Sequence, residues 1–357
     1  MSSRPSRPAS RGALALVAGL LLSTALTACG QEAPVSPEAD DGRPVVLTTF
    51  TVLADMARNV SGDHLRIESI TKPGAEIHGY EPTPSDIRKA AEADLILDNG
   101  LGLEAWFEQF VADLDVPHRV LSEGVDPIPI ADDTNEGLPN PHAWMSPESA
   151  RIYVDNIVDA FSELDPQHAS DYATNGEAYS AELVAVQQEL VTDLSSLPEQ
   201  QRALVTCEGA FSYLARDADL TERYIWAVNA EQQATPQRIA SVIDFVRSNE
   251  VPAVFCESTV SDKTMRQVVE STDAEFGGTL YVDSLSEPDG PVPSYLELIR
   301  HDAELIADAL TGAEAPNDAD APAEAAALGE ATAPNEAATL TGAATPTGAS
   351  APNGGEA

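Results

Sequence analysis

Basic residues are scarce in this chain. Its 357 residues include 19 lysines and arginines against 59 aspartates and glutamates, for a formal net charge of −40. A surface of this sign repels the phosphate backbone of DNA and RNA, so we exclude nucleic acid as a partner. Salt screens such a field within about 10 Å, and we therefore favour solubility over cation steering as the reason for the charge.

Two common catalytic signatures are also absent. No G-x-x-x-x-G-K-[ST] loop is present to cradle nucleotide phosphates, and no H-E-x-x-H motif is present to hold a catalytic zinc. Any process driven by ATP would therefore need an ATPase on a separate chain. These absences favour a binding protein over an enzyme.

Cysteine occurs only at positions 29, 207 and 256. Cys207 and Cys256 lie in apolar runs that we read as buried strands. In an oxidising compartment the two could pair. We favour two buried thiols, because sequence spacing alone does not bring their Cα atoms within bonding distance.

The chain also lacks an apolar run long enough to span a bilayer comfortably. The longest candidate, Ala13–Leu26, follows three arginines and ends in Leu-Thr-Ala-Cys-Gly, the lipobox pattern of bacterial lipoproteins. We predict a signal peptide over residues 1–28 and a lipid on Cys29 that anchors the protein outside the cell membrane. Residues 29–44 would form a flexible spacer. Loss of the three arginines would take the net charge from −40 to −43.

Strand and helix signals alternate over the next part of the chain. This alternation predicts an α/β fold with two lobes, each a four-stranded parallel sheet flanked by helices. We assign residues 45–166 to the first lobe and 199–312 to the second. The predicted strands are Val45–Phe50, Leu65–Ile70, Asp94–Asp98, Arg119–Leu121, Ala203–Cys207, Tyr224–Val228, Ala253–Glu257 and Thr279–Val282.

A long proline-free segment separates the lobes. Apolar residues at helical spacing predict one rigid linking helix over about Gln167–Leu194, within a connecting segment of residues 167–198. After the second lobe, residues 313–357 contain no lysine, arginine or aromatic residue. This acidic tail, rich in alanine, proline and threonine, cannot bury a core, so we predict that it is disordered.

Four good metal ligands stand at loops and strand ends. His78 follows the second predicted strand and His142 precedes a capped helix, while Glu208 and Asp283 directly follow apolar runs. Parallel sheets bind ligands at the carboxyl ends of their strands. Two neutral imidazoles and two carboxylates would cancel the charge of a divalent cation, which suits a first-row metal such as manganese or iron.

The motifs around these residues resemble the cluster A-I (zinc/manganese-type) metal-binding lipoproteins, the substrate-binding subunits of ATP-binding-cassette (ABC) transporters. The matching stretches are H-G-Y-E-P-T-P-S-D-I (78–87), D-L-I-L-D-N-G-L-G-L-E (94–104), N-P-H-A-W (140–144), T-C-E-G-A-F-S-Y (206–213), Y-I-W-A-V-N-A-E-Q-Q-A-T-P (224–236) and V-D-S-L (282–285). The resemblance implies two lobes joined by one long helix and a metal in the cleft between them. It places the four metal ligands on His78, His142, Glu208 and Asp283.

The third ligand position is informative about the metal. Zinc-binding relatives usually have histidine there and often a histidine-rich loop, whereas this chain has Glu208 and no histidine in residues 123–140. Both departures resemble the manganese branch, with zinc or iron as other possible metals. Protons should compete with the metal, and we expect affinity to fall as the pH drops through the histidine range near 6.5.

Three functions compete for these features. The resemblance implies capture of a metal ion and its delivery to a membrane permease, with the permease and its cytoplasmic ATPase as separate chains and this protein a monomer. A metalloenzyme would keep an open metal position, which four protein ligands would fill. The alternative is a cell-envelope or adhesion protein stabilised by the metal; placement of the ligands on both lobes favours capture and release instead.

Overall fold

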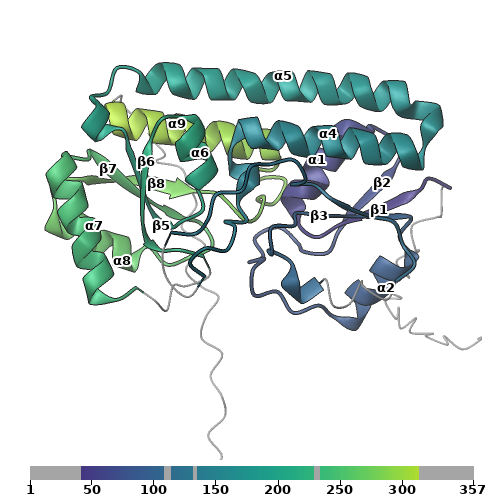
Figure 1. Cartoon of the computed structure of the whole chain (residues 1–357), viewed down its shortest axis with the longest axis horizontal. Coiled ribbons are helices and arrows are strands. Elements are labelled where there is room, and N and C mark those ends of the chain that lie inside the picture. Colours follow the sequence, from purple (N-terminus) through teal and green to yellow (C-terminus); the bar gives the residue numbers. More distant parts are fainter. Residues whose placement is uncertain (1–41, 108–113, 132–134, 229–233, 313–357) are drawn as a thin grey trace, which may run out of the picture. The chain divides into compact units, whose positions relative to one another are not determined.

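The first lobe is built on one continuous parallel sheet. The computed structural model describes residues 42–107, 114–131, 135–228 and 234–312 (Figure 1). The sheet has the order β2-β1-β3-β4, and its strands are β1 (Val45–Thr48), β2 (Arg66–Ser69), β3 (Leu95–Asp98) and β4 (His118–Val120). Val46 pairs with Ile67 on one side and with Leu95 on the other. Central β3 is buried along its whole length because helices and loops cover both faces.

The second lobe has its four predicted strands in a different arrangement. They are β5 (Ala203–Glu208), β6 (Thr221–Trp226), β7 (Ala253–Glu257) and β8 (Glu275–Leu280). In the described part of the chain they form two parallel pairs, β5-β6 and β7-β8, rather than one four-stranded ladder. Strands β5 and β7 lie side by side at the seam between the pairs (Figure 1).

A disulfide crosses this seam. Cys207 of β5 and Cys256 of β7 are bonded, with their Cα atoms 4.9 Å apart. The prediction of two free thiols is therefore wrong. The two strands are 49 residues apart in sequence, and their proximity comes from the tertiary fold, which spacing in the sequence does not encode.

Helices flank the sheets and join the lobes. The α-helices are α1 (Thr51–Ser61), α2 (Pro84–Glu92), α4 (Pro147–Leu164), α5 (Ala169–Leu194), α6 (Ser212–Asp217), α7 (Pro236–Asn249), α8 (Lys263–Ser271) and α9 (Tyr295–Thr311), and the short 3₁₀ helices are η1 (Ala143–Met145), η2 (Pro166–His168) and η3 (Glu199–Gln201). Thr83, Ser146 and Thr235 each cap a helix through the side-chain oxygen, with proline at the first helical turn.

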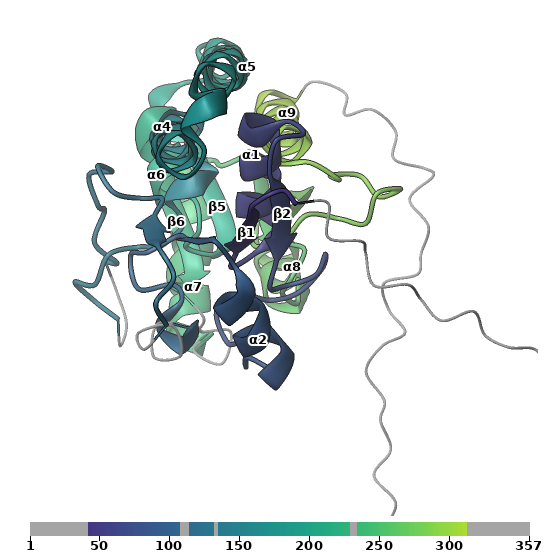
Figure 2. The same ribbon diagram turned by 90° about the vertical axis from the view of Figure 1, so that its right-hand side faces the viewer.

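The predicted long helix is confirmed as α5, which has 26 residues. It runs above both lobes, with α4 and α9 packed beneath it (Figures 1 and 2). Its inner face buries Tyr172, Tyr179, Leu183 and Leu190. One helix spanning both lobes restrains their relative movement, because bending it would break backbone hydrogen bonds.

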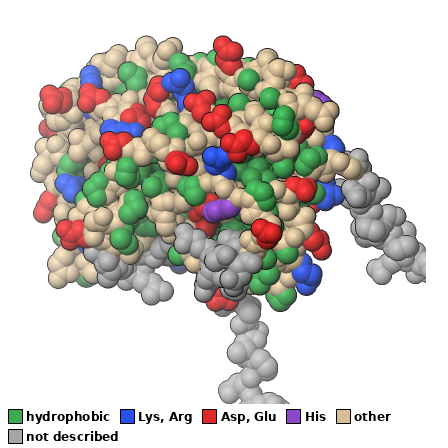
Figure 3. Space-filling model, turned by 45° about the vertical axis from the view of Figure 1, so that its right-hand side comes forward, with side chains coloured by type: hydrophobic (Ala, Val, Ile, Leu, Met, Phe, Trp, Pro, Cys, Tyr) green, Lys and Arg blue, Asp and Glu red, His purple; other side chains and the backbone are tan. Residues whose placement is uncertain are grey.

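Several predictions concern residues outside the described ranges: the signal peptide, the lipid on Cys29, most of the spacer and the tail after Gly312. Among the described helices, none has the length and apolar character needed to cross a membrane. Acidic side chains are spread over the face drawn in Figure 3 rather than gathered into one patch. This distribution agrees with a role of the net charge in solubility.

Candidate metal centre

His78 lies on the loop between β2 and α2. The carboxylate of Glu76 accepts hydrogen bonds from the backbone N–H of His78 at 2.8 Å and from that of Gly79 at 2.9 Å. These two bonds close a tight turn that directs the imidazole inwards. Its side chain is only 2% exposed.

His142 stands at the start of η1 and is fully buried. Asn140 Oδ1 accepts from the backbone N–H of His142 at 3.0 Å and lies 2.9 Å from its Nδ1. An amide oxygen only accepts, so Nδ1 must carry the proton and Nε2 keeps its lone pair. The orientation of the amide is fixed because its nitrogen donates to Gly209 O at 2.6 Å.

The two carboxylates come from the second lobe. Glu208 is the last residue of β5, and its backbone N–H donates to Glu257 Oε2 at 3.1 Å. Asp283 follows β8 by three residues, and its Oδ2 accepts from Thr259 at 3.5 Å. Its other oxygen, Oδ1, is buried and has no hydrogen-bond partner among the described residues.

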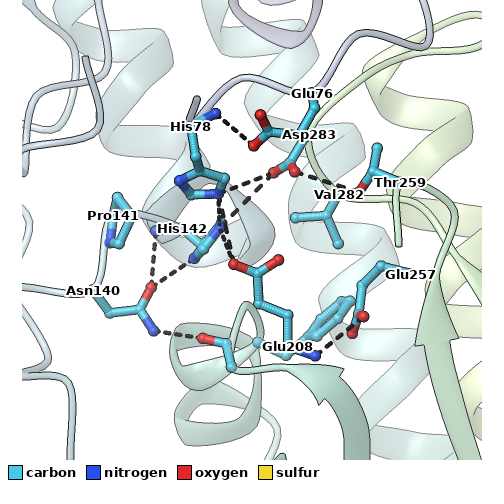
Figure 4. A network of polar contacts seen from close by, with 12 residues as sticks. Glu76, His78, Asn140, Pro141, His142, Glu208, Glu257, Thr259, Val282 and Asp283 are labelled. Carbon is cyan, nitrogen blue, oxygen red and sulfur yellow. Dashed lines mark hydrogen bonds and ion pairs between the residues drawn. The ribbon is translucent and has the colours of Figure 1, made fainter. Parts of the chain in front are cut away.

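The structure brings all four predicted residues together (Figure 4). His78 Nε2 lies 3.0 Å from His142 Nε2 and 3.7 Å from both Glu208 Oε1 and Asp283 Oδ1. His142 Nε2 lies 3.9 Å from Glu208 Oε1 and 3.8 Å from Asp283 Oδ1. Ligand atoms arranged tetrahedrally at about 2.1 Å from a cation lie about 3.4 Å apart. The five observed separations, each of which includes a histidine nitrogen, are close to that value. Ligand atoms of His78, His142 and Asp283 all lie within 4.8 Å of one another, so these three side chains could hold one small cation with Glu208 beside both histidines.

Burial sets the protonation of these groups. It lowers the pKa of His78 to about 3 and holds the pKa of His142 well below its usual value, with the neighbouring His78 adding to the second effect. Both imidazoles are therefore neutral at pH 7, as metal ligation requires. Burial, followed by repulsion from Glu76, raises the pKa of Asp283 to about 7. A cation beside this carboxylate would favour its ionised form.

The motifs contained positioning residues that the sequence analysis did not assign. Asn140 begins N-P-H-A-W, and Glu76 precedes His78 by two residues, so both were close to a predicted ligand. Glu257 ends an apolar run just as Glu208 does, which was the available signal for it. Trp144 follows His142 by two residues, and its ring lies 5.1 Å from that of His142.

Comparison with known proteins identifies the family. Residues 46–309 match the family described as ZnuA, zinc-uptake complex component A, periplasmic. The chain belongs to this family. Members of it are substrate-binding components of metal ABC transporters rather than enzymes, and a permease and an ATPase are the partners that such a component implies.

Individual relatives bind different metals. The chain is similar to the iron-binding protein YfeA of Yersinia pestis, with 53% identity over 263 residues, covering 73% of this chain and 85% of that one. It is 32% identical over 303 residues to the manganese ABC transporter substrate-binding lipoprotein ScaA of Streptococcus gordonii, covering 83% and 97%. The solved structure of a Mn-bound periplasmic metal-binding protein from Candidatus Liberibacter asiaticus has 37% identity and a TM-score of 0.71, covering 75% of this chain and 100% of that one.

Proposed function

We propose that this protein captures a divalent transition metal ion between its lobes and delivers it to a membrane permease. The observation that supports this most strongly is that each of the two imidazole nitrogens lies within 3.9 Å of a Glu208 oxygen and of an Asp283 oxygen. In this proposal His78, His142, Glu208 and Asp283 are the metal ligands. The buried, partnerless Oδ1 of Asp283 supports it, because a buried oxygen without a hydrogen bond is costly unless a cation compensates it.

Manganese is our first choice of metal. Two carboxylates and two neutral imidazoles make the bound site formally neutral and rich in oxygen, which suits manganese better than three histidines and one aspartate would. Iron(II) is the second choice, since the relative with 53% identity is named iron-binding. Zinc binds most nitrogen and oxygen sites more tightly than manganese, so affinity alone does not decide the cargo.

A cavity beside His78 is our proposed entry point for the metal. A cavity of about 330 Å³ opens there, and its wall includes Trp106, Leu138 and Pro139. Of the four proposed ligands, His78 is the one that lines this cavity. We therefore propose that His78 meets the incoming ion first.

The metal can be identified directly. The full chain would be purified from its own cells without added metal, and its bound elements measured. We expect manganese, or iron, at about one ion per chain. A protein that carries no first-row metal, and takes up none when it is supplied, would contradict the proposal.

A membrane tether would keep the protein close to the permease. We propose that a lipid on Cys29 tethers a monomer to the outer side of the cell membrane, within reach of the permease. Cys29→Ala should release the protein from membranes and lower cellular manganese uptake, while purified protein still binds the metal. A Cys29→Ala protein that stays bound to membranes and incorporates labelled palmitate would contradict the tether.

A further inference from the structure

We propose that the Glu257 side chain and the Cys207–Cys256 disulfide position Glu208 for the metal, an inference that rests on the proposed function. Neither group touches the predicted cation position. Both act on the strand end that carries the third ligand.

The starting observation is the seam in the second lobe. Strand β5 is hydrogen-bonded to β6, and β7 to β8, but in the described part of the chain no ladder joins β5 to β7. A parallel ladder normally fixes the alignment of neighbouring strands. Between β5 and β7 the alignment must come from other bonds. Glu208 lies on β5, which has a ladder to β6 but none to β7.

Two bonds supply the constraint at matching positions. The disulfide joins the residues directly before Glu208 and Glu257, one on each strand. One residue further on, Glu257 Oε2 accepts the backbone N–H of Glu208 at 3.1 Å (Figure 4). This carboxyl oxygen thus provides the acceptor that a neighbouring strand would have supplied.

A buried carboxyl group at position 257, at the end of β7, lowers the stability of the fold. It is 2% exposed, and its Oε1 has no hydrogen-bond partner among the described residues. Burying a carboxyl with one oxygen unsatisfied lowers stability unless the group serves another purpose. Its Oε2 accepts a hydrogen bond from the backbone N–H of a proposed metal ligand, Glu208, which indicates that purpose.

Positioning matters because the metal requires close geometry. Glu208 Oε1 lies 3.7 Å from His78 Nε2 and 3.9 Å from His142 Nε2. Groups that orient metal ligands typically contribute a factor of about 10 to 100 in affinity. If the end of β5 could shift along β7, Glu208 would be less well placed and the metal affinity would fall by part of that factor.

A pair of matched variants tests the role of Glu257. Glu104 in the first lobe is also 2% exposed, and burial raises the pKa of both carboxyls to about 8. It accepts from Thr49 and Asn99 and contacts none of the proposed ligands. The variants Glu257→Leu and Glu104→Leu therefore remove similar buried acids from different surroundings.

Manganese affinity would be measured by calorimetry on the full chain, and the melting temperature without metal would be measured separately. We expect Glu257→Leu to lower affinity by about 10- to 100-fold, and Glu104→Leu to change only the melting temperature. Glu257→Gln keeps an acceptor oxygen and should bind within about threefold of the parent. Glu257→Asp, which is the variant to use if leucine prevents folding, is too short to reach Glu208 N and should lose affinity as leucine does.

The disulfide has its own test. Dithiothreitol can reduce the disulfide to two thiols. The reagent gives up two electrons and two protons and closes to its own cyclic disulfide. Reduced parent and the Cys207→Ser/Cys256→Ser variant should both bind manganese about tenfold more weakly, with a changed manganese electron paramagnetic resonance spectrum. A parent that binds no metal would overturn the proposed function and this inference together. A parent that binds, with Glu257→Leu, Glu257→Asp and the serine variant all binding equally well, would overturn this inference alone.

Discussion

The two lobes contribute different chemistry to one site. The first lobe provides His78 and His142, which burial keeps neutral, and the second provides the carboxylates of Glu208 and Asp283. Imidazoles alone would leave a buried dication uncompensated, and carboxylates alone would leave a buried pair of negative charges. A divalent ion satisfies both lobes only when they are together, so the metal would hold them closed.

The lobes also hold their ligands in different ways. In the first lobe, side chains within a few residues of each histidine fix it, namely Glu76 and Asn140. In the second lobe, Glu208 depends on a strand 49 residues away. Asn140 links the two arrangements, because it bonds His142 on one side and Gly209 O on the other. Local motifs therefore build one half of the site, and tertiary contacts build the other.

The largest expected effect comes from removing the ligands one at a time. Each of the four alanine variants should lower manganese affinity by more than about 100-fold, beyond the usual effect of an outer positioning group. If the charge division between lobes matters, Glu208→Ala and Asp283→Ala should lose more than the two histidine variants. Calorimetry would measure all four. If the parent and all four variants bound manganese equally well, these four residues would not be the metal ligands.

Asn140 tests the link between the lobes. Asn140→Ala frees His142 to take the other tautomer, with the proton on the nitrogen that faces the metal, and it breaks the bond to Gly209. We expect a loss of about 10- to 100-fold in manganese affinity. Asn156 is a matched control, since its amide donates to the carbonyls of Leu121 and Glu123 at a distance from the site. Similar losses in Asn156→Ala would indicate general destabilisation instead.

The pH dependence separates the two kinds of ligand. The sequence predicted competition by protons in the histidine range near 6.5, but burial lowers the pKa of His78 to about 3. Asp283, with its pKa raised to about 7, takes the proton first as the pH falls. Affinity should therefore fall about tenfold per pH unit below 7. Asp283→Asn should bind more weakly and show a flatter profile between pH 7 and 5; an unchanged slope would assign the proton to another group.

The smallest effect concerns metal choice. Glu208→His keeps a ligand but removes one negative charge from the second lobe, so the bound site becomes positive and richer in nitrogen. The ratio of zinc to manganese affinity should rise by about tenfold, which corresponds to about 1.4 kcal/mol. Calorimetry with both metals measures the ratio. An unchanged ratio would show that the third ligand does not set selectivity.

Much of the candidate site could be predicted from the sequence because the four proposed ligands stand at local boundaries. Glu208 and Asp283 follow apolar runs, and the residues around His142 carry both a cap and a recognisable motif. The helix caps at Thr83, Ser146 and Thr235 are local in the same way, because capping is a contact within a few residues.

The features that were missed depend on contacts between distant segments. The disulfide and the bond from Glu208 to Glu257 both join strands far apart in sequence, and no local pattern encodes their distance. The split of the second sheet into two pairs belongs to the same class. The pKa values of the histidines also required the structure, since their shift is caused by burial.

The most direct test of the account removes one ligand from each lobe. The full chain and its His78→Ala/Asp283→Ala variant would be dialysed against manganese and then analysed for bound metal. We expect about one manganese ion per parent chain and less than about a tenth of that in the variant. Circular dichroism would verify that the variant is folded. A folded variant that retains its manganese in full would contradict the claim that the two lobes bind one metal between them.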